Sequence, residues 1–396
     1  MNDKRKQSLL VLGIVLIACN LRAPITSVGP LVPTIQGDTG LSGTWTGMIT
    51  TLPLLCFGLV SPFVSRLGRR FGGPQAVFGG MVATVAGLVI RSYCGVWGLY
   101  LGTLLIGSGI AVSNVLIPSI IKEDFPTRAG TMMSVYTTAM SVFAAAGSGV
   151  SVPLAAGLGL GWKNALASLL VLAVPATLLW LPQLKGGAGR QGAGGGDLFR
   201  RMLRDPLAWK ITLCMGSQSL LFYAIIAWLP SILLGRGVTV EQSGGLLTAM
   251  QLVGLPAAFF IPLLADRRRD QRRIADTVTA LFAVGFLGLC FGRGLWVLTP
   301  CLLCLGFAQT ASLSLALSFF VCRCRGGEET AAISGMAQSA GYLLSAVGPL
   351  LFGALFDWTG SWVAPLVFYG GVILLYAYTA HQSSKDVYLL DGGAER

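Results

Sequence analysis

The amino-acid sequence predicts an all-α membrane protein with twelve transmembrane helices in two six-helix halves. Composition is the first indication, because 54% of the 396 residues are hydrophobic and only 11% are charged, too apolar a balance for one large soluble core. The second is a series of apolar segments that each reach the length of about 20 residues needed to cross a bilayer. The third is a repeat, since residues of the two halves match at an offset of 200 positions.

The apolar segments follow one another in a regular order. We expect twelve spans, at roughly 9–35, 45–65, 74–92, 96–121, 131–157, 162–181, 208–234, 243–265, 273–292, 295–321, 331–357 and 361–380. The first span follows Lys4-Arg5-Lys6, as a signal peptide would, but no small-residue cleavage site comes after it, so we interpret it as a retained helix. An even number of spans puts both termini on one side of the membrane.

The longest interruption divides the spans into two groups of six. It begins with a glycine-rich stretch typical of a flexible linker and ends in a basic stretch suited to an anionic membrane surface. We expect an N-terminal half at 1–184, a cytoplasmic linker at 185–207 and a C-terminal half with a short cytoplasmic tail at 208–396. Matching residues occupy equivalent spans of the two halves: Pro30 and Pro230, Pro62 and Pro262, Ser134 and Ser334, Trp162 and Trp362. A repeat of six spans is typical of transporters that hold a substrate between their halves.

The basic residues define the expected orientation. Lysines and arginines that flank the spans number 23 on the side of the amino terminus and 4 on the opposite side, the latter being Arg91, Lys163, Arg236 and Arg293. By the positive-inside rule, both termini are expected in the cytoplasm. The net charge of +12 follows from this distribution and does not indicate a nucleic-acid surface, because the basic residues form short clusters between apolar segments. The expected partners are the lipid bilayer and a small-molecule substrate.

Several longer motifs carry a resemblance to a known family. They are LRAPITSVGPLVP, TTLPLLCFGLVSPFVSRLGRRFG, SNVLIPSIIKEDFP, DPLAWKITL with IIAWLPSIL, and SGMAQSAGYLLSAVGPLLFGALFD. Together they resemble the cyanate and nitroimidazole transporter family of the major facilitator superfamily, most closely its nitroimidazole exporter branch. The resemblance covers nearly the whole chain. It implies the major facilitator fold and a carrier of small molecules in the bacterial inner membrane.

The loop after the second span departs from the superfamily pattern. Its usual core is Asp-Arg-x-Gly-Arg, whereas this chain has Ser65-Arg66-Leu67-Gly68-Arg69-Arg70, so the first acid of the usual charge relay is missing. The second-half counterpart, Ala265-Asp266-Arg267-Arg268-Arg269-Asp270, retains an acid. We expect a cytoplasmic gate formed by Arg66, Arg69, Arg70 and Asp266. The fourth span has Gly107-Ser108-Gly109 without the preceding arginine that is common in proton-coupled members, which weakens a proton-antiport interpretation.

Arg22 is the one charged residue that we expect deep inside a span, in the stretch ACNLRAPITS. An arginine at the centre of a membrane helix costs roughly 2.5 to 3.5 kcal/mol on insertion scales, so it should face an anionic partner or a water-filled cavity. None of the sixteen carboxylates lies at an expected midplane. A guanidinium can hold a carboxylate, a cyanate-like anion or a nitro group in a planar arrangement. We therefore expect Arg22 to contact the substrate; the alternative is that it braces two helices through water, carbonyl oxygens and polar side chains.

Six further polar side chains are candidates for the substrate site: Thr26, Asn114, Tyr223, Gln309, Gln338 and Tyr342. Thr26 lies one helical turn after Arg22, and Tyr223 lies one position from its repeat equivalent. Gln338 and Tyr342 continue a polar stripe along one face of the eleventh span, together with Ser334 and Ser345. Each of these side chains is equally compatible with a hydrogen bond between helices of the bundle.

Other functional classes have little support. The nine cysteines are scattered singly and fit small packing residues better than a disulfide framework or a metal site, and the sole histidine, His381, is expected at the solvated end of the last span. We expect no catalytic residues, no metal, no cofactor and no enzymatic activity. The favoured function is a monomeric alternating-access exporter of nitroimidazole-like compounds. The alternatives are an uptake carrier for cyanate or another small anion, and a membrane receptor or scaffold that transports nothing.

Overall fold

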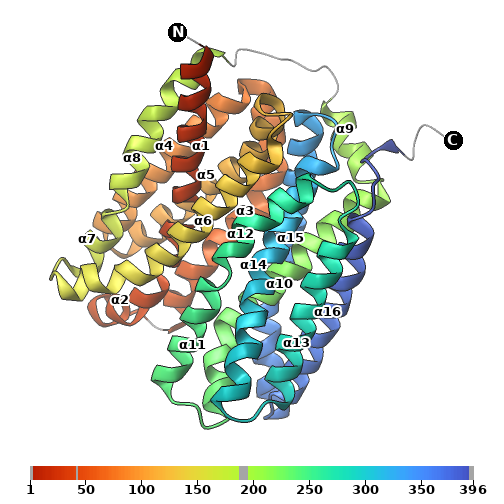
Figure 1. Ribbon diagram of the computed structural model, residues 1–396. Helices are drawn as coiled ribbons and strands as arrows, with labels where there is room; N and C mark the ends of the chain where they lie inside the picture. The colour runs from red at the N-terminus through yellow and green to blue at the C-terminus, as the bar shows by residue number, and fades with distance from the viewer. Residues whose placement is uncertain (1–2, 42, 187–194, 392–396) are drawn as a thin grey trace. The chain divides into compact units, whose positions relative to one another are not determined.

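The computed structural model describes residues 3–41, 43–186 and 195–391. Sixteen α-helices account for most of these residues, and no strand occurs within these ranges (Figure 1). The chain forms two compact units. Unit 1 consists of 1–127 and 135–198, and unit 2 consists of 128–134 and 199–396, so the first residues of one helix belong with the second unit.

Unit 1 is a helical bundle in which α4 and α5 form the most extensive contact. Its elements are α1 (Asp3–Thr26), the 3-10 turn η1 (Gly29–Leu31), α2 (Val32–Thr39), α3 (Gly43–Phe71), α4 (Gly73–Tyr93), α5 (Gly95–Asp124), α6 (Ala129–Val152), the π turn η2 (Pro153–Gly157), α7 (Gly161–Ala167), α8 (Leu170–Trp180) and the 3-10 turn η3 (Leu181–Gly186). The short helix α9 (Gly195–Met202) follows. Bare glycines let α4 and α5 approach closely, because the backbone of Gly87 lies against the carbonyl of Gly102.

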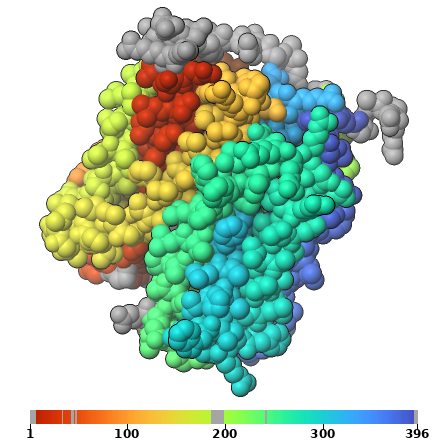
Figure 2. All heavy atoms as spheres, in the orientation of Figure 1, coloured from red at the N-terminus to blue at the C-terminus, as the bar shows by residue number. Residues whose placement is uncertain are grey.

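Unit 2 is built around α10, which packs against α15, α16 and α14. Its helices are α10 (Pro206–Leu234), α11 (Val240–Leu252), α12 (Leu255–Asp266), α13 (Arg272–Phe291), α14 (Leu295–Cys322), α15 (Gly327–Thr359) and α16 (Val363–Ser383). Asp205 caps α10 by accepting a hydrogen bond from the amide of Leu207 at 2.7 Å. In the space-filling view, side chains of α12, α13 and α14 form one continuous surface of this unit (Figure 2).

Among the described residues, twelve helical segments are long and apolar enough to cross a bilayer. Each of them overlaps one of the twelve expected spans, so the predicted number and order of spans are confirmed for the described residues. The expected linker, 185–207, includes residues 187–194, which lie outside the described ranges. The boundaries of the halves and linker therefore stay predictions.

Three expected spans are divided between two α-helices; one of them is the sixth, in which α7 ends at Ala167 and α8 begins at Leu170. The first was expected as one helix over 9–35, but α1 ends at Thr26 and the chain continues through η1 into α2. Gly29-Pro30 explains part of this break, because proline has no amide hydrogen and disfavours a helical conformation of the preceding residue. The eighth span divides into α11 and α12 on either side of Val253-Gly254, where a Cβ on Gly254 would lie 2.1 Å from the hydroxyl of Thr310.

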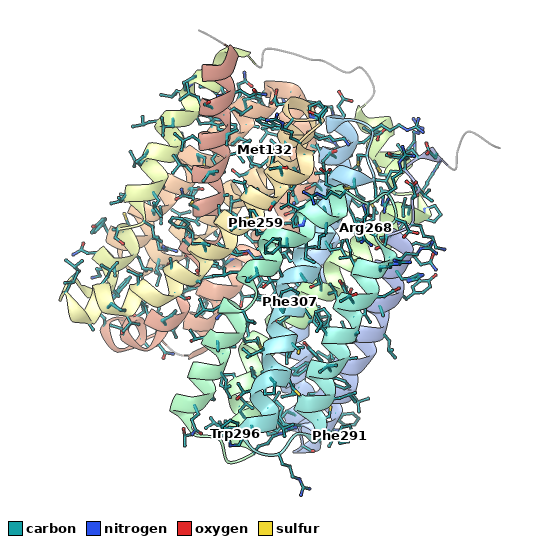
Figure 3. The ribbon with its side chains drawn as sticks, in the orientation of Figure 1. Met132, Phe259, Arg268, Phe291, Trp296 and Phe307 are labelled. Carbon is teal, nitrogen blue, oxygen red and sulfur yellow. The ribbon has the colours of Figure 1, made fainter. Side chains whose placement is uncertain are left out.

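Exposed side chains mark the two ends of unit 2. Phe291 and Trp296 lie at the end where α13 meets α14, and Arg268 lies at the other end of α13 (Figure 3). The side chains of Phe291 and Trp296 are 79% and 95% exposed. Exposed aromatic residues beside the ends of helices are typical of spans that reach the interfaces of a bilayer.

Candidate functional site

The turn of α1 that carries Arg22 is held by contacts within unit 1. Arg22 is half-buried, and its carbonyl oxygen accepts a hydrogen bond from the Thr26 hydroxyl at 3.2 Å. The same hydroxyl donates to the carbonyl oxygen of Ala144 on α6 at 2.8 Å. Gly147 allows this approach, since a Cβ there would lie 3.0 Å from the Cα of Ala23. The proton of Thr26 is therefore committed to the backbone, and its oxygen can only accept a hydrogen bond from a substrate.

Asn114 lies in a second polar contact of unit 1. Its amide oxygen accepts a hydrogen bond from the Tyr136 hydroxyl at 3.3 Å, and both side chains are buried. Tyr136 lies on α6 and is 1% exposed. This hydrogen bond joins α5 to α6. Asn114 therefore has a structural role, in addition to the substrate contact that we expect of it.

The expected residues of unit 2 lie on three helices. On α15, the Gln338 amide donates to the Ser334 hydroxyl at 2.8 Å, and the carbonyl oxygen of Tyr342 accepts from Ser345 at 2.9 Å. On α14, Gln309 is buried and reaches the carbonyl oxygen of Leu221 on α10 at 3.5 Å. Tyr223, two residues further along α10, is half-buried and packs edge-on against Phe222. Gln309 and Tyr223 are thus brought to neighbouring parts of α10 and α14.

Helix packing places α10 and α15 close together at this level. A Cβ on Gly216 would lie 3.2 Å from the Cα of Gly341, and one on Gly348 would lie 2.9 Å from Leu220. These close approaches surround Tyr342, which is 5% exposed. Small residues at such an interface let polar side chains on neighbouring turns be buried between helices.

Charge is distributed unequally between the spans of the two units. Arg22 lies inside a span of unit 1, and the carboxylates in the spans of that unit, Glu123 and Asp124, stand at the very end of α5. In unit 2 every charged residue of a span belongs to its first or last turns, as Asp276 and Asp357 do. The interior positions of the spans therefore carry positive charge only, an electrostatic setting that favours an anion or a dipolar acceptor group.

The expected gate residues fall in both units. Arg66, Arg69 and Arg70 lie in the last two turns of α3, and none of them takes part in an ion pair among the described residues. In unit 2, Asp266 ends α12 and its side chain lies against Gly130 at the start of α6, where an added Cβ would be 2.6 Å from Oδ2. A carboxylate at a helix N-terminus is electrostatically favourable.

A second acid, Asp270, follows in the same loop and pairs with Arg272. Asp270 accepts hydrogen bonds from the Nε atom and the backbone amide of Arg272, at 2.9 and 3.0 Å to its two oxygens. These bonds, together with the charge of the Arg272 guanidinium, lower the pKa of Asp270 to about 2. Asp270 thus accepts the Arg272 amide at the start of α13 as a carboxylate and is not a proton carrier near neutral pH.

Three residues have side-chain partners that the sequence did not predict: Arg91, Arg323 and His381. Arg91 and Arg323 were counted only as flanking charges, yet both are 2% exposed and donate to backbone carbonyls. The Nδ1 atom of His381 lies 2.8 Å from a carboxylate oxygen of Asp276, so the expected solvated end residue has a partner. A signal was present for Arg91, because it falls within the expected span 74–92. No sequence signal identified the carbonyl partners of Arg323.

Comparison with known proteins settles the family. The model of the Major Facilitator Superfamily matches residues 10–349. The chain belongs to the major facilitator superfamily. It is therefore a transporter by family, as the resemblance in its motifs predicted.

Curated relatives cover this superfamily member almost from end to end. It is 40% identical over 383 residues to a 2-nitroimidazole transporter of Escherichia coli (strain K12), covering 96% of this chain and 97% of the relative. It is 39% identical over 397 residues to the uncharacterized transporter YycB of Bacillus subtilis (strain 168), covering 100% and 98%. It is 27% identical over 368 residues to the cyanate transport protein CynX of E. coli (strain K12), covering 91% and 93%. These matches confirm the predicted branch.

Solved structures share the fold of this major facilitator protein at low sequence identity. The proton:xylose symporter XylE aligns with a TM-score of 0.75 and 13% identity, covering 98% of this chain and 99% of XylE. The human organic anion transporter MFSD10 aligns with a TM-score of 0.72 and 18% identity, covering 94% and 98%. These likenesses confirm the predicted fold and carry no information about substrate.

Proposed function

We propose that this transporter carries a small anionic or nitro-bearing molecule by alternating access and exports nitroimidazole-like compounds. The observation that carries the proposal is Arg22, a half-buried arginine at the interrupted end of α1, within spans whose interiors hold no carboxylate. A planar guanidinium donates two parallel hydrogen bonds, and the two oxygens of a nitro group or carboxylate accept them. Recognition of the substrate is therefore assigned to Arg22.

The remaining substrate contacts are proposed on the same basis. Asn114, Gln309, Gln338, Tyr223 and Tyr342 supply amide and phenol groups that donate or accept hydrogen bonds within the spans. Thr26 supplies an acceptor oxygen one turn from Arg22, because its proton is bonded to Ala144. A heteroaromatic ring with a nitro substituent needs both kinds of contact, an arginine for the nitro oxygens and acceptors for a ring N–H group.

A second candidate function is uptake of cyanate or another small anion. It is supported by the likeness to the cyanate transport protein, although the identity of 27% is lower than the 40% shared with the 2-nitroimidazole transporter. A non-transporting receptor or scaffold is the alternative from a different class. The three proposals differ in what crosses the membrane and in which direction.

The setting of this function is also a proposal. We place the protein as a monomer in a bacterial inner membrane, with both termini and the 185–207 linker in the cytoplasm. The support is the distribution of flanking basic residues, 23 against 4. On that orientation, Arg66, Arg69, Arg70 and Asp266 belong to the cytoplasmic gate.

The decisive experiment is solute flux in proteoliposomes containing the full chain. Labelled 2-nitroimidazole, cyanate and a small carboxylate are each loaded inside or outside, and initial rates are measured against concentration. Saturable flux of 2-nitroimidazole, competed poorly by cyanate, is the expected result. Saturable cyanate flux alone would support the second candidate. A folded protein that gives no saturable flux of any solute would support a receptor.

Arg22→Lys tests the assignment of the recognition residue. The variant keeps the charge but replaces a planar fork by a point charge, so we expect the affinity for 2-nitroimidazole to fall at least about tenfold, or about 1.4 kcal/mol. Binding to purified protein is the measurement, with thermal unfolding as a check on folding. Arg293→Lys, at an exposed arginine between α13 and α14, is the matched control and should bind normally. Unchanged affinity in a folded Arg22→Lys protein would favour a bracing role.

A further inference from the structure

Arg91 is a buried arginine with one hydrogen-bond partner. It lies in the last turn of α4 and is 2% exposed. Its Nη1 atom donates to the carbonyl oxygen of Pro24 on α1 at 2.7 Å. Among the described residues its Nε and Nη2 atoms have no hydrogen-bond partner, and no carboxylate pairs with it. Within the described part of the chain, the guanidinium is therefore hydrogen-bonded to α1 through the Pro24 carbonyl.

The carbonyl of Pro24 is available because α1 ends there. In a continuing helix, the amide of Val28 would donate to Pro24, but it donates to Ile25 at 3.3 Å. The amide of Ser27 still donates to Ala23 at 3.1 Å, so the helical pattern stops at the Pro24 carbonyl. Arg91 supplies the hydrogen-bond donor that the helix no longer supplies. The contact lies two residues after Arg22.

The backbone of α4 at Arg91 is closely packed against α5. A Cβ on Gly102 of α5 would lie 2.4 Å from the amide nitrogen of Arg91 and 2.6 Å from its Cβ. One helical turn earlier on α4, a Cβ on Gly87 would lie 2.7 Å from the carbonyl oxygen of Gly102. The backbone of α4 at Arg91 thus rests directly on α5, and packed interiors resist deformation. Because the Arg91 backbone is held against α5, its guanidinium can fix the position and rotation of the α1 turn that it binds.

Stability of the fold is a poor explanation for a charge at this position. Burying a cation without a counter-ion is costly, and replacing buried charges by apolar side chains of similar volume is often neutral or stabilising. One hydrogen bond to a carbonyl group contributes less than that cost, and two donor atoms stay unbonded. Ionisable residues in membrane spans are functional by default. The nearest functional group along α1 is Arg22.

We propose that Arg91 is a positioning residue for the substrate site: by holding the Pro24 carbonyl, it fixes the turn of α1 that presents Arg22. The inference rests on the proposed role of Arg22 in binding. Thr26, bonded to Ala144 on α6, fixes the same turn from another side. The guanidinium of Arg22 is then presented from a turn with two anchors, and displacing a binding group by about 1 Å can reduce function about a hundredfold.

A double-mutant cycle tests this inference. Affinity for 2-nitroimidazole is measured on purified full-length protein for Arg91→Gln, Arg91→Lys, Arg22→Lys and the Arg91→Gln, Arg22→Lys double variant. Arg91→Gln should weaken binding about tenfold, because the turn loses one anchor. Arg91→Lys should stay within about threefold of the parent protein, because one ammonium N–H suffices for one carbonyl. In the Arg22→Lys background, Arg91→Gln should cause little further loss, since residues that act through each other are not additive.

Hydrogen–deuterium exchange on the same proteins supplies a second measurement. Arg91→Gln should increase exchange in residues 20–28 and leave residues 220–228, the repeat-equivalent stretch of α10, unchanged. If Arg91→Gln cannot be purified, Arg91→Lys decides, with near-parental affinity and exchange expected. Arg293→Gln, an exposed arginine of unit 2, is the control and should change neither measurement.

Three outcomes would overturn the inference. One is an Arg91→Gln protein that unfolds at lower temperature yet binds 2-nitroimidazole with parental affinity, which would make Arg91 a structural residue only. Another is an equal loss of affinity in both backgrounds, which would mean that Arg91 acts independently of Arg22. The third is an Arg91→Lys protein that loses as much affinity as Arg91→Gln. Failure of the proposed function is read separately, as unchanged affinity in Arg22→Lys alone.

Discussion

Arg323 has more side-chain hydrogen bonds than any other described arginine of unit 2, and its removal should lower the stability of the protein. The guanidinium donates to the carbonyl oxygens of Ser383 at 3.0 Å, Ser384 at 2.7 Å and Arg269 at 3.2 Å, and also to the side chain of Gln271. It thereby joins the ends of α12, α14 and α16. We expect Arg323→Gln to lower the stability of the protein by about 3 kcal/mol, because buried carbonyl groups would lose their donors. Thermal unfolding of the purified protein is the measurement.

Arg325→Gln is the matched control, two residues away. The Arg325 side chain is 67% exposed and pairs with Asp391 at 2.7 Å. A surface ion pair contributes about 0 to 1 kcal/mol, so the unfolding temperature should hardly change. If the two variants lost equal stability, burial would not be the reason for the importance of Arg323.

The same contrast shows which part of the site could be predicted at the residue scale. Arg22 was recognisable because a charge within a long apolar run has no solvated position available to it. Arg91 and Arg323 stand at the ends of spans, where sequence gives the depth of a residue but not the direction of its side chain. Their burial depends on carbonyl groups of distant segments, Pro24 for one and Ser383 for the other. Only the folded chain brings these groups together.

At the scale of the elements, the positions of the membrane spans were predictable because they depend on hydropathy alone. All twelve spans were found, because a bilayer requires about 20 apolar residues whatever their neighbours are. Interruptions within the spans were not found, and prolines show the reason. Pro30 lies in η1 beyond the end of α1, whereas its repeat equivalent Pro230 lies inside the continuous helix α10. A proline frees backbone groups in both cases, and tertiary partners determine whether the helix continues.

At the end of helix α1, a side chain from another helix bonds a carbonyl group that the interruption leaves without its helical partner. The Pro24 carbonyl oxygen, to which the Val28 amide does not donate, accepts a hydrogen bond from Arg91 of α4, and the Thr26 hydroxyl donates to Ala144 of α6. Backbone groups left open within a membrane need such partners. The sequence contains proline and glycine at the right place, but it does not contain the information that α4 carries the compensating donor to that place.

At the scale of the whole molecule, the orientation in the membrane is a direct prediction. Both termini and the 185–207 linker should be cytoplasmic, because lysine and arginine flank the spans 23 times on that side and 4 times on the other. A reporter active only in the periplasm, fused after Gly187, should be inactive. Fusions after Arg236 or Arg293 should be active, and a cytoplasm-active reporter should give the complementary pattern. The reverse result at these three positions would invert the proposed gate.

The energetics of transport provide the last prediction. We expect transport without a proton carrier at the membrane midplane, with export as the easier direction. Accumulating an anion against an inside-negative potential requires about 2.3 kcal/mol per charge per 100 mV, which normally demands co-moving cations. The described spans place Asp276 and Asp357 near their ends, and Asp276 is already paired with His381 at 2.8 Å. An anion that leaves the cell moves down the electrical gradient and needs no such group.

Two gradients applied separately to proteoliposomes test this expectation. With voltage clamped, a pH gradient should drive no net flux of cyanate or 2-nitroimidazole. With pH clamped, a potential negative on the side that holds the substrate should accelerate efflux of cyanate and leave neutral 2-nitroimidazole unaffected, because only the anion carries charge through the field. Proton movement is followed at the same time, in the parent protein and in Asp276→Asn with Asp357→Asn. Proton flux in fixed proportion to substrate that persists in the double variant would require a coupling group in the interior of the spans, where the electrostatic argument for Arg22 assumes that none exists.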